Sequence, residues 1–296
     1  MKTILRTFVG CTAILFGTAC MGAVKYVPEN MKVELSLKVP GNNAVNYKLH
    51  PDKLENSYFD YEWRSDNKLP ITVFHKVEER DSCMRLTVQL TAAQDVYFNY
   101  RQLLSTGYRH DNCQFYMPGF WYRRNLRSPK KAPSFHTSDS WLVREDRLSA
   151  PLTGIFSEKE KRFMTVNRLD DFSMDALATH KEGEIILSGK TSLGFTGFEN
   201  QQGIAMLSFG FPYREAPKSY IRKLTLAPEV EAFQLMKKGE SVLLTWEIME
   251  SGADDFSDFI QHTWEHCYDT YAPKPVENSY SIADMKQVLS CFFVNS

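Results

Sequence analysis

Apolar and polar residues alternate one by one along most of this chain, from about residue 31 to residue 250. The alternation is clearest over residues 31–38, 84–90 and 242–248, and it recurs in shorter segments at 96–100, 184–187 and 205–211. Successive side chains of a strand point to opposite faces, so this period predicts strands with one face on a core. The helical period is almost absent over the same range.

Turn-forming residues separate these segments, at 40–43, 65–67, 181–183 and 237–240. Gly, Pro, Asn and Asp favour the backbone angles of tight turns, and their spacing predicts roughly a dozen strands or more. No repeat of fixed period appears, which argues against a propeller or a solenoid. The sequence therefore predicts a mainly β fold, a large antiparallel β-sandwich over residues 24–250, larger than one immunoglobulin module.

The pattern changes at Ser251. Asp254 and Asp255 supply an acidic helix start, and large apolar residues then recur every three or four positions as far as Tyr271. The prolines of 272–275 end this helix, and a second helical run extends from 281 to 293. We therefore expect residues 251–296 to form a linker helix and the first helix of a truncated α-helical domain. The alternative is a C-terminal helix docked on the sandwich.

The first nineteen residues have the order of a secretory signal peptide. Lys2 and Arg6 precede an apolar run at 8–16, and small residues follow at 17–19. The run is shorter than the ~20 apolar residues that span a bilayer. We therefore expect an exported protein, in the periplasm or at the cell surface.

Cys20 leaves the form of export open. Residues 17–19 resemble a bacterial lipobox, but Gly17 stands where a leucine is usual. Lipidation of Cys20 would tether the mature chain to a membrane by its lipid alone. Cleavage near Ala23 would instead release a soluble protein.

Charge and cysteine content exclude several functions. The formal net charge is −1, and it becomes −3 once Lys2 and Arg6 are removed with the signal peptide. A nucleic-acid partner would require a basic excess, so none is expected. Cys83 and Cys113 are compatible with a disulfide, but equally with buried free thiols. The cysteine spacing fits no metal motif, and Thr263 stands where a zinc protease helix needs glutamate after His262. We expect no metal and no cofactor.

Aromatic residues and arginines are densest between residues 113 and 147. A sugar presents an apolar C–H face that stacks on an aromatic ring, and arginine binds hydroxyls or a uronate carboxylate with a planar fork of donors. The alternative places these rings in the core, capped by the arginines. The candidates for glycan binding are Trp121, Tyr122, Arg123, Arg124, Trp141 and Arg144.

Catalytic residues cannot be assigned from the sequence. Glycoside hydrolysis uses two facing carboxylates. Glu145–Asp146 and Asp170–Asp171 are adjacent pairs, and neighbours in a strand point to opposite faces, so neither pair can flank one bond by itself. One member of each pair remains a candidate.

The order of these features resembles the N-terminal region of secreted glycoside hydrolases and polysaccharide lyases with a six-hairpin, (α/α) toroid. In that family a large β-sandwich, the supersandwich, precedes a linker helix and the toroid. The matching features are the signal peptide, the long β-rich stretch, the aromatic segment 259–269 and the proline-containing step 271–275.

The resemblance implies a role in polysaccharide degradation. The toroid of such enzymes usually carries the acid and the base, so a chain without it would support and edge an active site and be inactive alone. Two alternatives remain: a self-sufficient glycan-binding surface lipoprotein, and a structural lipoprotein without a sugar site. The expected ligand is a polysaccharide or an oligosaccharide.

Overall fold

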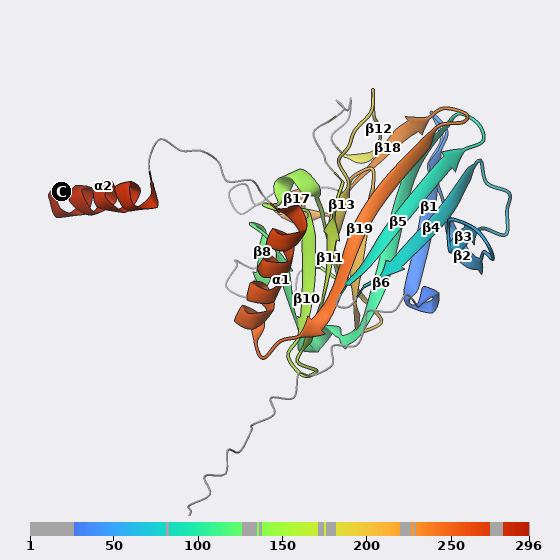
Figure 1. Ribbon diagram of the computed structural model, residues 1–296. Helices are drawn as coiled ribbons and strands as arrows, with labels where there is room; N and C mark the ends of the chain where they lie inside the picture. Colours follow the sequence, from blue (N-terminus) through green and yellow to red (C-terminus); the bar gives the residue numbers. More distant parts are fainter. Residues whose placement is uncertain are drawn as a thin grey trace, which may run out of the picture.

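The computed structural model confirms a mainly β fold, in which two layers of paired strands pack face to face (Figure 1). It describes residues 27–80, 83–125, 135, 138–170, 175, 182–219, 226–227, 229–272 and 281–295. The predicted signal peptide and Cys20 lie outside these residues, so export and lipidation remain predictions.

The first layer is antiparallel throughout. Its strands, in spatial order, are β2 (Val45–Lys53), β1 (Met31–Lys38), β6 (Val96–Arg109), β14 (Ile204–Phe211), β13 (Phe195–Gln201) and β9 (Ser140–Arg144). The short 3₁₀ turns Pro28–Asn30, His110–Asn112 and Glu145–Arg147 adjoin it.

The second layer is also antiparallel and carries the C-terminal helix. Its strands, in spatial order, are β3 (Tyr61–Arg64), β4 (Ile71–Glu79), β5 (Cys83–Ala92), β19 (Ser241–Gly252), β11 (Arg162–Arg168), β10 (Leu152–Ser157), β7 (Cys113–Met117) and β8 (Trp121–Arg123). The first half of β2 pairs with β1 and its second half with β3, so this strand joins the two layers.

Smaller strands extend one end of the sandwich. β18 (Val230–Met236) pairs with β6, with β15 (Arg214–Glu215) and, in parallel, with β12 (Gly183–Ile186). β16 (Lys218–Ser219) and β17 (Leu226–Ala227) form a separate two-stranded pair.

The main core lies between the layers and follows from the period-two pattern. Along β5 the side chains of Leu86, Val88 and Leu90 all point inward and are fully buried, as alternation predicts. They belong to the same cluster as Leu35 of β1 and Trp246 of β19. The predicted strands at 31–38, 84–90, 96–100, 184–187, 205–211 and 242–248 all coincide with observed strands, apart from single residues at their ends.

Helix α1 (Phe256–Tyr271) covers the outer face of the second layer (Figure 1). It begins at Asp255, whose carboxylate accepts hydrogen bonds from the backbone N–H groups of Ser257 (2.7 Å) and Asp258 (2.9 Å). It ends at Ala272, which has left-handed backbone angles. The helix predicted after Ser251 therefore exists, with its start and its end where capping residues and proline place them.

One face of α1 is buried on the sheet. Phe259 has no exposed surface and packs with Phe156 of β10 and Phe163 of β11, at ring-centroid distances of 6.0 and 5.0 Å. A Cβ at Gly154 of β10 would lie 2.6 Å from the Phe259 ring, so the glycine permits this close approach. Burial of one such ring stabilises the fold by about 1.5–3 kcal/mol, and this packing fixes the helix on the sheet.

Helix α2 (Ile282–Asn295) is drawn apart from the sandwich in Figure 1. Ser281 and Asp284 cap its start reciprocally: the Asp284 N–H donates to the Ser281 hydroxyl at 3.1 Å, and the Ser281 N–H donates to the Asp284 carboxylate at 2.9 Å. Its side chains from Ala283 to Val288 are exposed. Neither described helix has the length and apolar character of a bilayer-spanning segment. The assignment of residues 251–296 to a separate helical domain stays a prediction.

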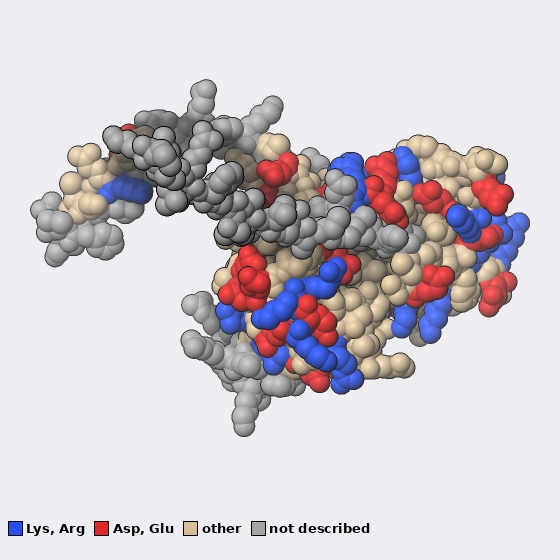
Figure 2. Space-filling model, turned by 60° about the horizontal axis from the view of Figure 1, so that its bottom comes forward, with Lys and Arg blue, Asp and Glu red and all other residues tan. Residues whose placement is uncertain are grey.

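The described cysteines are free thiols, as in the alternative to a disulfide between Cys83 and Cys113. Cys83, Cys113 and Cys267 are buried free thiols, and Cys291 is an exposed one. The Cys83–Cys113 disulfide is therefore not formed. At the surface, acidic and basic side chains are interspersed over the described part of one face (Figure 2).

Candidate functional site

The two tryptophans predicted to stack on a sugar lie inside the sandwich. Trp121 is fully buried and Trp141 is 4% exposed. Their rings pack against each other at 4.9 Å, and Trp121 also packs on Phe198 at 5.1 Å. The Trp121 indole N–H donates to the backbone oxygen of Arg123 at 2.8 Å. In this conformation neither tryptophan presents a ring face to a ligand.

The predicted arginines point to different places. Arg123 covers the ring of Phe256 at 5.1 Å. Arg124 covers Phe135 at 5.2 Å and donates to the backbone oxygen of Cys113 at 3.0 Å. These contacts agree with the alternative in which the arginines cap aromatic rings of the core.

Arg144 lies over the ring of Tyr213 at 4.4 Å and pairs with Asp146 (2.6 Å) and Asp175 (3.1 Å). Tyr122, by contrast, exposes 52% of its surface. The structure therefore does not bring the six candidates together, and a sugar-binding role for those at the surface stays a prediction.

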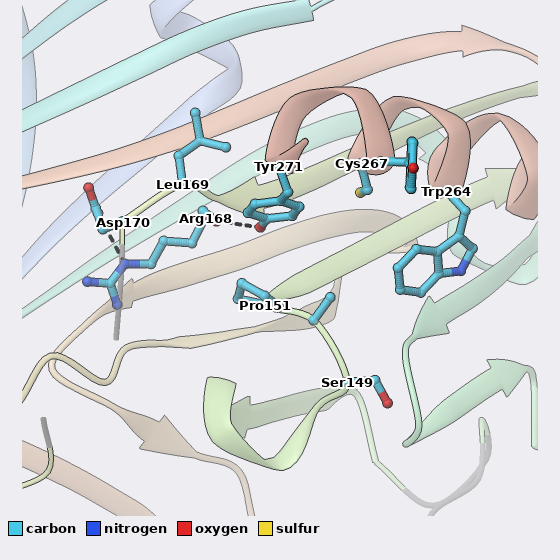
Figure 3. A pocket seen from close by; sticks show the side chains of 10 residues that line it. Ser149, Pro151, Arg168, Leu169, Asp170, Trp264, Cys267 and Tyr271 are labelled. Atoms are coloured by element: carbon cyan, nitrogen blue, oxygen red, sulfur yellow. Dashed lines mark hydrogen bonds and ion pairs between the residues drawn. The ribbon is translucent and has the colours of Figure 1, made fainter. Parts of the chain in front are cut away.

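A pocket of about 660 Å³ opens beside α1. One wall is formed by α1, and the opposite wall by the segments that precede β10 and follow β11 (Figure 3). We call it the α1 pocket. Its lining residues are Ser149, Ala150, Pro151, Arg168, Leu169, Asp170, Trp264, Cys267, Tyr268 and Tyr271.

Three aromatic side chains of α1 form what we call the aromatic wall of this pocket: Trp264, Tyr268 and Tyr271. They are spaced by four and three residues, which places them on one side of a helix. Their exposed fractions are 39%, 65% and 41%. The burial of Phe259, on another face of the same helix, holds these rings outward.

Hydrogen bonds fix two members of the wall. The Trp264 indole N–H donates to the Tyr116 hydroxyl at 2.8 Å, and burial raises the pKa of Tyr116 to about 12. The Tyr271 hydroxyl lies 2.6 Å from Asn167 Oδ1 and 2.8 Å from the backbone oxygen of Arg168. Burial also raises the pKa of Tyr271, so both phenols stay protonated. Tyr268 is the more exposed ring between them.

The described start of the predicted segment 113–147 adjoins this wall through Tyr116. Tyr116 of β7 packs against Tyr122 of β8 at 5.3 Å, and Tyr116 accepts the hydrogen bond from Trp264. The backbone N–H of Ser149, which lines the pocket, donates to the backbone oxygen of Pro118 in the β7–β8 turn at 3.0 Å. Of the predicted candidates, Tyr122 is thus connected to the pocket through one shared neighbour.

The charged end of the pocket is already balanced. Arg168 is 3% exposed and pairs with Glu145 at 2.7 Å and with Asp170 at 3.2 Å. Glu145 is fully buried and also accepts the Gly194 N–H at 2.7 Å. Burial raises the pKa of the Glu145 carboxyl, and the guanidinium of Arg168 acts in the opposite direction. The two candidate carboxylates thus meet at one arginine and hold it in place.

The described lining of the pocket contains one carboxylate and several aromatic side chains. Asp170 is the carboxylate among its described lining residues, and its Oδ2 accepts the Thr245 N–H at 2.7 Å in addition to Arg168. Hydrolysis of a glycosidic bond uses two carboxylates on opposite sides of that bond. The described lining offers instead aromatic faces with a few hydroxyl groups at their edges, which suits a ligand with an apolar face.

Comparisons with known proteins find a match in structure but not in sequence. No family model matches the chain, and no curated protein matches it. A polysaccharide lyase is similar over 79% of this chain and 27% of its own, with 13% identity and a TM-score of 0.36.

Two further solved structures are similar at the same level. A putative aldose 1-epimerase from Klebsiella pneumoniae subsp. pneumoniae is similar over 81% of this chain and 62% of its own, with 10% identity and a TM-score of 0.36. A GH36 α-galactosidase from Geobacillus stearothermophilus is similar over 74% and 30%, with 10% identity and a TM-score of 0.29. This chain spans about a quarter of the lyase, 27%.

Proposed function

We propose that this chain binds a glycan in the α1 pocket, with a sugar ring stacked on the aromatic wall. The observation that carries the proposal is the arrangement of Trp264, Tyr268 and Tyr271, which are exposed on one face of α1 and line one pocket. Exposed aromatic rings gathered at a concave site are typical of ligand binding.

The physical argument rests on surface removed from water. Each exposed ring presents apolar area, and covering it contributes about 25 cal/mol per Å². A sugar ring has an apolar C–H face to cover a ring and hydroxyl groups at its edge that require partners. Tyr268 is the most exposed ring of the aromatic wall, at 65% of its surface. The hydroxyl group of Ser149 lies across the pocket (Figure 3).

We further propose that this chain is the sandwich portion of an exported polysaccharide-degrading enzyme. The order of sandwich, α1 and α2 supports this role, together with the secretory pattern of residues 1–19. The pocket would then edge an active site rather than contain one, because its described lining lacks a facing pair of carboxylates. A self-sufficient glycan-binding lipoprotein is the alternative, in which the pocket alone accounts for the activity.

A glycan array followed by calorimetry on the full chain tests the proposal. Tyr268→Ala should weaken binding of the selected oligosaccharide by about tenfold, which corresponds to about 1.4 kcal/mol. The matched control is Tyr58→Ala, since Tyr58 is equally exposed, at 70%, but belongs to the β2–β3 connection. Its affinity should equal that of the unmodified protein. Both variants should keep the melting temperature.

Two results would overturn the proposal. One is an array without signal for neutral or acidic polysaccharides. The other is an equal loss of affinity in both tyrosine variants, because that would place the glycan away from α1. If Tyr268→Ala lowers the melting temperature, Tyr268→Phe is measured instead. This variant keeps the aromatic ring and should keep the affinity for the glycan.

A further inference from the structure

A second cluster of chemically reactive side chains lies beneath α1, between the helix and the sheet. It joins Cys83 of β5, Glu247 of β19 and His266 of α1, and one ligand atom of each lies within 4.8 Å of the others. We propose that these three residues bind a divalent transition-metal ion of the zinc type. This inference does not depend on glycan binding.

The strand register explains why the two sheet residues meet. Cys83 lies opposite Met249 in the β5–β19 pairing, and Glu247 is two residues from Met249 on the same strand. Side chains two apart in a strand share a face, so Cys83 and Glu247 both point outward, toward the helix. His266 follows the buried Thr263 by three positions on α1 and therefore faces the same sheet.

The donor atoms are close enough for a metal. His266 Nε2 lies 2.7 Å from Glu247 Oε1. Zinc binds nitrogen and oxygen at about 2.0–2.2 Å and sulfur at about 2.3 Å, so two donors of a tetrahedral site are about 3.3–3.7 Å apart. The cluster can reach that geometry with side-chain shifts on the order of 1 Å. His266 Nε2 and Glu247 Oε1 would move apart, and Cys83 Sγ would move toward both of them.

The donor set also suits such an ion chemically. Thiolate, imidazole and carboxylate together are typical zinc ligands. One thiolate and one carboxylate balance the two positive charges of the ion. Binding forms the sulfur–metal bond and releases the Cys83 thiol proton to solvent, with no change of oxidation state.

The surroundings support the site. Arg85 lies 3.5 Å from Glu247 Oε2, so it holds the second carboxylate oxygen and leaves Oε1 toward the cluster. The Thr270 hydroxyl donates to the same Oε1 at 3.1 Å and orients it, and a water molecule can occupy the fourth position of the ion. Cys83 and Glu247 are 5% and 3% exposed, but the His266 side chain is 23% exposed, which provides an entry from solvent.

Cobalt(II), a spectroscopic substitute for zinc, tests the inference on the full chain kept reduced. We expect one cobalt per chain, with a near-ultraviolet sulfur-to-cobalt charge-transfer band and the visible bands of a tetrahedral site. Cys83→Ser should abolish the charge-transfer band, and His266→Gln should lower the affinity at least tenfold. Zinc should displace cobalt and raise the melting temperature of the unmodified protein but not of Cys83→Ser.

Two variants serve as controls. His262→Gln removes a histidine one helical turn away, which faces Asp258 at 3.4 Å, and should leave the cobalt spectrum unchanged. Cys291→Ser removes the exposed thiol and should also leave it unchanged.

Absence of a stoichiometric sulfur band would overturn the inference, as would a band that persists in Cys83→Ser. If His266→Gln lowers the melting temperature of the metal-free protein, the Cys83→Ser spectrum decides the question, because serine keeps the size of the side chain.

Discussion

At the scale of single residues, the core contains a row of polar side chains. His75 of β4 has no exposed surface, and its Nε2 lies 2.9 Å from the Tyr100 hydroxyl. That hydroxyl donates to Gln102 Oε1 at 2.8 Å. The imidazole is therefore the donor to Tyr100, which requires a proton on Nε2. Burial lowers the pKa of His75 to about 3.

This buried imidazole makes stability depend on pH. An unfolded histidine takes up a proton near pH 6.5, but His75 in the folded protein does so only near pH 3. Between these values the unfolded state binds more protons, so acid lowers the free energy of unfolding, by about 1.4 kcal/mol per pH unit. His75→Gln should remove that slope in urea denaturation measured from pH 7 to pH 4. The exposed His50, changed to Gln, should leave the slope unchanged.

Parallel stability curves for His75→Gln and the unmodified protein would contradict this expectation. In that case the imidazole would have to be protonated inside the core. A lower stability of His75→Gln at all pH values would not matter, because the prediction concerns the slope.

Alternation along the chain predicts which neighbours point to opposite faces, but not which face meets the core. In β8, Trp121 is buried and its neighbour Tyr122 is exposed. The sequence alone treats both as candidates for one sugar site. The difference arises because Trp121 packs on Phe198 of β13, a contact between residues 77 positions apart that local pattern cannot show.

At the scale of elements, α1 carries two apolar stripes. One stripe, Phe256, Phe259, Thr263 and Cys267, is buried on the sheet, and the other, Trp264, Tyr268 and Tyr271, lines the pocket together with Cys267. The sequence predicts the helix and its ends because caps and prolines are local signals. It does not separate the stripes, because both have helical spacing. Likewise, Cys83 and Glu247 become neighbours of His266 only through the strand register.

The start of α1 gives a prediction at this scale. Asp255 accepts two backbone hydrogen bonds, from Ser257 at 2.7 Å and Asp258 at 2.9 Å. Asp255→Ala leaves both N–H groups without this acceptor and should lower the free energy of unfolding by about 1 kcal/mol. Asp254→Ala is the matched control, since Asp254 contacts Lys161 and Asp258 through its backbone oxygen and N–H group. Urea denaturation should show a change in the first variant only, and an equal loss in both would contradict the capping role.

At the scale of the whole molecule, the two layers share one core. Residues of β1, β4, β5, β6, β14 and β19 belong to a single cluster of buried side chains. Unfolding of the sandwich should therefore be a single cooperative transition. The described side chains of α2 do not belong to this cluster, and two of them, Met285 and Val288, are 45% and 66% exposed.

We expect the two C-terminal helices to contribute differently to stability. Deletion of residues 281–296 removes a helix whose described side chains, from Ala283 to Val288, are exposed, and it should leave the melting temperature nearly unchanged. Deletion of residues 256–296 also uncovers Phe156 and Phe163 and removes Phe259, each worth about 1.5–3 kcal/mol of burial. It should lower the melting temperature strongly. If the shorter deletion lowers it by several degrees, α2 docks on the sandwich in solution, which is the arrangement expected of a C-terminal helix that covers the strands.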